Sequence, residues 1–251
     1  MKNNRVRILG CEIDNLSMQE TLDEIERMID SDEYHQHVVV NVDKIVKANR
    51  NPELKQVINS CSLINVDGMP VVWASRLLGK PLKERVTGVD LFCNLIELSE
   101  KRRWRVFLLG AQEEVVRKVV AVLKDKYPLL DIVGYRNGYW SDDEEQSIVE
   151  FVRDKKPDLL FVAISSPKKE RFLGLHQPFM KVPFSMGVGG TFDVVAGITR
   201  RAPRWMQNTG LEWFYRFLQE PRRMFHRYFV EDVYFFWLLA KELNKMIFQR
   251  K

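Results

Sequence analysis

The sequence predicts an α/β fold: a doubly wound, mostly parallel, Rossmann-like sheet followed by a C-terminal helical appendage. Up to residue 198, apolar runs of strand length alternate with amphipathic stretches of helical spacing. The runs are continuous and rich in Val, Ile and Leu, which is typical of strands covered on both faces of a sheet. Beyond residue 198 only helical patterns occur. A length of 251 residues suits one such domain with an appendage.

Six apolar runs are each followed by a helical pattern. The runs lie at 37–42, 62–66, 104–110, 131–135, 158–165 and 183–190. The helical patterns lie at 43–58, 69–79, 113–127, 142–155, 168–176 and 191–197. A repeated strand-then-helix order indicates a parallel sheet with right-handed crossovers. We therefore expect residues 1–198 to form the α/β catalytic domain.

The dipeptide Asp67-Gly68 lies between two apolar runs and has two interpretations. Asp-Gly is a frequent hairpin turn. Met69-Pro70 favours instead a helix that begins there, with Pro in its first turn. A strand that ends at Asp67 would place its carboxylate at the carboxyl edge of the sheet, where open α/β folds bind ligands. Asp67 would then be either a general base or the N-cap of the next helix.

Residues 199–251 form the expected basic, aromatic appendage, which we interpret as a separate functional unit. They contain 11 Lys or Arg against 5 Asp or Glu, and 13 of the 28 aromatic residues. Two helices are predicted, one over 210–220 and a longer one that starts at Pro221. A basic, aromatic helix of this kind either packs on the domain or lies at a membrane surface, and one helix can do both with different faces.

Polar residues follow several of the predicted strands and would meet at one edge of a parallel sheet. The sets are Asn41 and Asp43, Asp67-Gly68, Gly110, residues 165–170 and residues 187–193. Gly189-Gly190 would let backbone amides approach a phosphate, with Thr191 as a helix N-cap, although such glycines are also common in tight turns. Arg85, Lys168 and Lys169 could contact a pyrophosphate or be solvated surface charges.

Metal chemistry is not expected. The three cysteines form no CxxC pair, and the four histidines form no HExxH motif. The sequence Asp30-Ser31-Asp32 resembles a DxD motif but follows a helix, with no strand before it. No signal peptide and no apolar run of membrane-spanning length are apparent, so a cytoplasmic protein is expected.

Seven sequence blocks, in this order, resemble the WecG/TagA/CpsF family of bacterial glycosyltransferases. They are "NVDKIVKANRNPEL", "VDGMPVVWASRLLGKPLKERVTGVDLF", "VFLLGA", "GYW", "PKKE", "GVGGTFDVVAGITRRAP" and "LEWFYRFLQEPRR". The resemblance implies an inverting, metal-independent and cofactor-free transferase. It would move a sugar from a UDP donor to a polyprenyl-diphosphate-linked sugar at the inner face of the cell membrane. In the TagA branch, N-acetylmannosamine is transferred to N-acetylglucosaminyl-diphospho-undecaprenol for wall teichoic acid or another surface polysaccharide.

The resemblance also implies roles for individual residues. Asp67 matches the base, Asn41 would place a sugar, and Arg85 would hold diphosphate or sugar groups. The resemblance assigns donor and nucleotide binding to Gly110, Lys169, Gly189, Gly190 and Asp193. Contact with the lipid-linked diphosphate falls to Arg216, Arg223 and Arg227. Members are often oligomeric, so a homo-oligomer is a further expectation.

Two positions depart from the TagA pattern: Val39 replaces a common Thr, and Lys169 a common Gln. Changes in the hydrogen-bonding groups of a site alter which sugar it accepts. Glucose or a uronic acid is therefore an alternative donor sugar, and a nucleotide-sugar-binding protein without turnover is an alternative function. A nucleic-acid-binding protein is a third class, but no such motif is present, and nucleic acid is not an expected partner.

Overall fold

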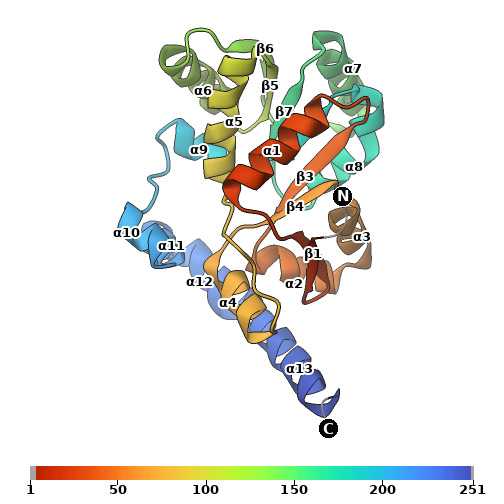
Figure 1. Ribbon diagram of the computed structural model, residues 1–251. Coiled ribbons are helices and arrows are strands. Elements are labelled where there is room, and N and C mark those ends of the chain that lie inside the picture. Colours follow the sequence, from red (N-terminus) through yellow and green to blue (C-terminus); the bar gives the residue numbers. More distant parts are fainter. Residues whose placement is uncertain (1–3, 250–251) are drawn as a thin grey trace.

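The computed structural model, which describes residues 4–249, confirms the predicted α/β class (Figure 1). Its main sheet has six parallel strands in the order β4-β3-β8-β7-β5-β6. The strands are β3 (His35–Val40), β4 (Leu63–Val66), β5 (Arg105–Gly110), β6 (Asp131–Arg136), β7 (Leu159–Ala163) and β8 (Phe184–Gly187). Each of the six predicted apolar runs overlaps one of them, although β3 begins two residues before its run and β6 ends one residue after its run.

Helices cover both faces of this sheet, as a doubly wound fold requires. The first face carries α1 (Met18–Ile29), α5 (Gly88–Arg102), α6 (Glu113–Lys126) and α9 (Thr191–Val195). The second carries α2 (Val42–Arg50), α3 (Pro52–Ser60), α7 (Glu145–Lys155) and α8 (Lys168–Met180). The short 3₁₀ helix η1 (Asp142–Glu144) directly precedes α7. Helix α4 (Met69–Leu77) follows β4. A hairpin of β1 (Arg5–Ile8) and β2 (Cys11–Asp14) forms a second, two-stranded sheet.

The helix expected over residues 43–58 is wrong as a single element, because the chain forms α2 and α3 there. Asn51 lies between them with extended backbone angles, and its side chain caps α3 by accepting from the Leu54 amide at 3.0 Å. Pro52 disfavours a helical conformation at the residue before it, which explains the break. The β1–β2 hairpin and α5 were not identified from the sequence.

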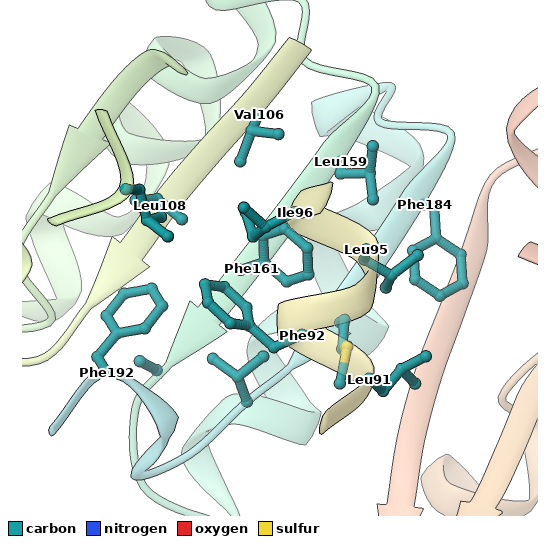
Figure 2. Packing of buried hydrophobic residues seen from close by; sticks show 14 of the residues in the cluster. Leu91, Phe92, Leu95, Ile96, Val106, Leu108, Leu159, Phe161, Phe184 and Phe192 are labelled. Atoms are coloured by element: carbon teal, nitrogen blue, oxygen red, sulfur yellow. The ribbon is translucent and has the colours of Figure 1, made fainter. Parts of the chain in front are cut away.

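The largest core cluster lies between the sheet and the first layer of helices (Figure 2). Helix α5 places Leu91, Phe92, Leu95 and Ile96 on its buried face, at the spacing expected of an amphipathic helix. The Phe92 ring meets the Phe161 ring of β7 edge to face, with centroids 4.7 Å apart. This packing fixes the N-terminus of α5 relative to the ends of the central strands.

The C-terminal region is helical, as predicted, and has more elements than expected. It contains α10 (Arg204–Asn208), α11 (Glu212–Gln219), α12 (Pro221–His226), the π-helical turn η2 (Arg227–Glu231) and α13 (Val233–Gln249). The long helix begins at Pro221, but η2 interrupts it immediately before Asp232. The side chains of Asn208, Arg223 and Gln249 lie outside the described part of the chain.

One face of α13 packs on the α/β body, while another is exposed. Phe235 and Leu239 are buried in the cluster that also contains residues of β1, β2, α2 and α4. Phe236 and Trp237 remain more than half exposed. Among residues 4–249, no helix is both long and apolar enough to cross a membrane.

Replacing Phe92 by alanine should lower the free energy of unfolding by about 3–5 kcal/mol, because it removes a fully buried ring and leaves a cavity. Urea denaturation followed by circular dichroism measures this loss. Phe179→Ala is the matched control, since that ring is 62% exposed and its removal should change stability by no more than about 0.5 kcal/mol. Equal losses in the two variants would contradict the assignment of Phe92 to the core.

Candidate active site

A cleft of about 1050 Å³ opens at the carboxyl ends of the parallel strands. Residues at or just after the ends of β3, β4, β5, β7 and β8 line it. Arg216 of α11, Met224 of α12 and Arg227 of η2 line it from the C-terminal region. The position agrees with the rule that open α/β sheets bind ligands at this edge. Parts of the chain almost 190 residues apart therefore share one cavity wall.

Asp67 directly follows β4 and lines the cleft. Its carboxylate does not cap α4, because the N-cap of that helix is Gly68 and no side-chain cap bond is present there. The Oδ2 atom instead accepts a long hydrogen bond of 3.4 Å from the Gly88 amide. Burial raises the pKa of the Asp67 carboxyl, and the nearby Glu212 carboxylate acts in the same direction, against Arg216 and Arg85. The helix-capping interpretation is thus wrong. The Asp67 carboxylate is therefore available to a ligand in the cleft.

Gly68 and Asn41 lie beside this carboxylate. Gly68 has a φ of +123°, which side-chain-bearing residues rarely adopt, so the sharp turn from β4 into α4 requires glycine. Asn41 lines the cleft and caps α2, since its Oδ1 accepts from the Lys44 amide at 2.9 Å. Its orientation is therefore held by the start of α2, which fixes where its amide group meets a ligand.

Three charged side chains are buried at the floor of the cleft. Lys44 Nζ lies 2.8 Å from Glu170 Oε1, and Lys169 Nζ lies 3.6 Å from the same oxygen. Burial lowers the pKa of Lys169 to about 8, and the neighbouring Lys44 adds to this effect. Two ammonium groups share one carboxylate, which leaves a net positive charge where Lys169 reaches the cleft. Such a charge favours an anionic ligand group.

The turn after β8 approaches Lys169 closely. A Cβ atom on Gly187 would lie 2.5 Å from Lys169 Cδ, so this position has no room for a side chain. Gly189 has φ +53° and Gly190 φ −76°, and successive residues with φ of opposite sign can direct their amides toward one anion. The expectation that Thr191 caps α9 is wrong: Gly190 is the N-cap, and the Thr191 hydroxyl donates to the Val188 carbonyl at 2.7 Å.

Gly110 does not line the cleft itself. A Cβ atom there would lie 2.5 Å from the Ala163 backbone, so glycine allows the ends of β5 and β7 to approach each other. The residues that follow, Ala111 and Gln112, line the cleft instead. Asp193 of α9 lines it as well, next to the Gly189-Gly190 turn.

Two of the three predicted C-terminal arginines line the cleft. Arg216 comes from α11 and Arg227 from η2. Arg227 Nη2 lies 3.9 Å from Asp43 Oδ2, and its Nε lies 4.0 Å from Asp232 Oδ2. Arg223 belongs to α12, and its side chain lies outside the described part of the chain.

Arg85 lies outside the lining of the cleft. Its Nη1 donates to Glu212 Oε2 at 3.0 Å, and its Nη2 to the Gln207 carbonyl at 3.4 Å. Arg85 thus holds α11 against the α/β domain. Glu212 was missed from the sequence, because no local pattern indicates a partner 127 residues away.

The described residues contain no group of three or more His, Cys, Asp or Glu side chains placed to hold a metal ion. The Asp30-Ser31-Asp32 motif lies in the turn after α1. His37 is buried within β3, where its Nε2 lies 2.9 Å from Asn65 Oδ1 and burial lowers its pKa to about 4. The cleft therefore combines the buried Asp67 carboxylate and three further acidic side chains with several cationic groups and a glycine turn. A set of this kind suits proton abstraction beside a phosphorylated ligand.

Comparisons with known proteins give a consistent result. The profile of the glycosyl transferase WecG/TagA/CpsF family matches residues 6–248. A protein of Bacillus subtilis (strain 168) is 34% identical over 212 residues, 84% of this chain and 82% of its own length. A protein of Staphylococcus aureus (strain MW2) is 32% identical over 222 residues, 88% of this chain and 87% of its own. Both are named N-acetylglucosaminyldiphosphoundecaprenol N-acetyl-beta-D-mannosaminyltransferase.

Replacing Glu170 by glutamine should lower the free energy of unfolding at pH 7 by about 3–5 kcal/mol, because two buried ammonium groups would lose their counter-ion. Burial opposes the charged carboxylate, but Lys44 and Lys169 outweigh it and lower the pKa of Glu170 to about 2. The contribution of this carboxylate is present above the unfolded-state pKa of 4.5 and is lost as the pH falls through 2.

Urea denaturation of both proteins from pH 7 down to pH 2 tests this. The difference between wild type and variant should be largest at neutral pH and should shrink below pH 4.5. Glu53→Gln is the matched control, since the Glu53–Arg171 pair is exposed and should contribute less than about 1 kcal/mol. A Glu170 variant as stable as the control variant would refute the buried-cluster interpretation.

Proposed function

Since the chain belongs to the WecG/TagA/CpsF family and is a glycosyltransferase, we propose that it transfers a sugar from a UDP donor to N-acetylglucosaminyl-diphospho-undecaprenol, with inversion at the anomeric carbon and without a metal ion. The acceptor is the one named for the relatives, and N-acetylmannosamine is accordingly the first donor sugar to test. The product would enter wall teichoic acid or another surface polysaccharide.

The observation that carries this proposal is the state of Asp67. Its carboxylate lines the cleft, caps no helix and has a raised pKa because it is buried. A carboxylate of this kind can take the proton of the acceptor hydroxyl. That oxygen then forms a bond to the anomeric carbon as the bond from this carbon to the UDP oxygen breaks. The electron pair of the broken bond leaves with UDP.

The cationic groups of the cleft would balance the charge of the two diphosphates. Lys169 and the amides of the Gly189-Gly190 turn are placed to contact the donor, and Asp193 beside them suits ribose hydroxyl groups. Arg216 and Arg227 line the cleft from the C-terminal helices, and we assign them to the lipid-linked diphosphate. Arg223 belongs to the same proposed set by sequence. Arg85 would act indirectly, through the position of α11.

Lys169 bears on the identity of the donor sugar. A buried ammonium group at the cleft floor binds a carboxylate or phosphate oxygen more strongly than a neutral hydroxyl group. A uronic acid is therefore a second candidate donor, whose carboxylate would contact Lys169. A panel of UDP-N-acetylmannosamine, UDP-glucose and a UDP-uronic acid separates these cases.

We propose further that the protein binds peripherally to the inner face of the cell membrane. The exposed aromatic residues of α13 and its neighbours, next to arginines, form a surface that suits an anionic bilayer. The buried face of α13 keeps this surface attached to the domain that holds the cleft.

Asp67→Asn should lower the turnover by about 10²- to 10⁴-fold and leave the affinity for UDP nearly unchanged, since the amide keeps the shape but cannot accept the proton. We would measure UDP release with the donor panel and a synthetic acceptor lipid, without added metal, and UDP binding by calorimetry. Asp32→Asn, in the exposed Asp30-Ser31-Asp32 turn, is the control and should keep wild-type turnover.

The possible outcomes separate the hypotheses. Undiminished turnover of the Asp67 variant would remove this residue from the role of base. UDP binding by the wild type without transfer from any donor would favour a nucleotide-sugar-binding protein instead.

Replacing both Phe236 and Trp237 by serine should weaken binding to vesicles that contain anionic lipid by roughly 10-fold or more, because two exposed apolar side chains can no longer enter the interface. Co-sedimentation with such vesicles measures this effect. The control replaces Leu175 and Phe179 of α8, which are equally exposed, and should bind as the wild type does. Equal binding by all three proteins would refute the proposed membrane surface.

A further inference from the structure

Glu212, at the start of α11, lies in an ion-pair network beside Asp67 that the proposed chemistry does not yet use. We propose that Glu212 is a positioning residue for the transfer reaction: it fixes the C-terminal helices on the α/β domain and balances the charge of the arginines around the base. This inference rests on the proposed role of Asp67 as the base.

The first observation is the set of contacts that Glu212 makes. Its Oε2 accepts from Arg85 Nη1 at 3.0 Å, and its Oε1 lies 3.8 Å from Arg201 Nε. The Glu212, Arg85 and Arg201 side chains are only 18%, 15% and 21% exposed. One carboxylate thus joins three segments: α11, the loop before α5 and the loop that precedes α10. Ion pairs this well shielded from solvent lose more when one partner is removed than surface pairs do.

The network continues to the N-terminus of α5. Arg201 Nη2 donates to Asp90 Oδ2 at 2.6 Å, and the Thr87 hydroxyl donates to the same oxygen at 2.6 Å. Thr87 also caps α5 by accepting from the Asp90 amide at 3.1 Å. The next residue, Gly88, is the one whose amide donates to Asp67 Oδ2. The contacts of Glu212 therefore end at the backbone segment that hydrogen-bonds the base.

The second observation is the charge around Asp67. Glu212 and Arg216 face it from α11, Arg85 from the loop before α5 and Arg201 from the loop before α10, and α5 contributes the Gly88 amide. Glu212 is the acidic member of this set, and it pairs with two of the three arginines.

This balance decides whether Asp67 can act as a base. An unbalanced guanidinium near a carboxylate stabilises its charged form and makes it a weaker proton acceptor. Glu212 is the carboxylate partner of Arg85 and, more distantly than Asp90, of Arg201. By its own charge it also favours a proton on Asp67. Arg216 is then left to contact the substrate from the same helix, at a position that Glu212 fixes.

Three variants separate charge from shape. Glu212→Gln keeps the length of the side chain and removes the charge, whereas Glu212→Asp keeps the charge and shortens the reach. Glu242→Gln removes one negative charge from α13 and is the charge-matched control. For each variant we would record kcat/KM from pH 4 to pH 9, titrate the Asp67 carboxyl by ¹³C NMR and check folding by thermal unfolding.

Turnover requires deprotonated Asp67, so kcat/KM rises with pH through the pKa of that group. Glu212→Gln should move this acidic limb to lower pH, because burial would still raise the pKa of Asp67 but the charge of Glu212 would no longer add to that effect. The maximal kcat should fall several-fold, since the base is weaker and α11 less firmly held. Glu212→Asp should leave the limb near its wild-type position while lowering kcat, and Glu242→Gln should change neither.

An acidic limb and an Asp67 titration that stay unchanged in a folded Glu212→Gln protein would overturn the proposal. A loss of kcat in both Glu212 variants with an unmoved limb would also overturn it and would leave only a structural role. The NMR titration needs no turnover, so it tests this inference even if the wild type transfers none of the sugars. A wild type that transfers none of the sugars would count against the proposed function, but it would not count against the proposed charge balance around Asp67.

Discussion

The parallel direction of the six strands is the constraint on which the site depends. Because all six run the same way, the residues after β3, β4, β5, β7 and β8 meet at one edge of the sheet. Asp67, Asn41 and Lys169 are far apart in sequence and come together for this reason alone. Both sheet faces are buried under helices, so this edge is where the sheet remains open to a ligand.

The two diphosphate-containing substrates that we propose would need a cleft with positive charge, and burying positive charge is costly unless it is paired. The fold meets this requirement by giving buried cations carboxylate partners. Lys44 and Lys169 share Glu170, Arg85 and Arg201 share Glu212, and Arg227 lies near Asp43 and Asp232. The pairing is incomplete at Lys169, and a cation of this kind is ready to contact a ligand.

The parts of the fold that depend on the local spacing of apolar residues could be predicted from the sequence. The strands could be predicted because both faces of the sheet are buried, which makes each run continuously apolar. Asp67 could be placed at the sheet edge because it directly follows such a run, and Lys169 because it comes four residues after another. The break at Asn51-Pro52 could have been predicted from the proline. One helix was predicted instead, because the residues on both sides of the break have helical spacing. Helix α5 was also readable from the spacing of Leu91, Phe92, Leu95 and Ile96.

The contacts between the two parts of the chain could not be predicted in this way. Arg85 and Glu212 are 127 residues apart, and neither lies in a pattern that indicates a partner. The same holds for Gly110, whose sequence position suggests a phosphate turn while the structure shows a close approach to Ala163. Pairings of this kind depend on how the C-terminal helices dock, and docking is decided by packing between surfaces that local sequence does not specify.

The docking of these helices also relates the proposed membrane surface to the cleft. Arg227 lines the cleft, and Trp237 is exposed ten residues further along nearly continuous helix. At up to about 1.5 Å per residue, the two positions are separated by no more than about 15 Å along the helix axis. A lipid-linked diphosphate lies at the membrane surface, within reach of a site at that distance. Because Phe235 and Leu239 fix α13 on the domain, the bilayer, the cleft and Asp67 would keep one spacing during the reaction.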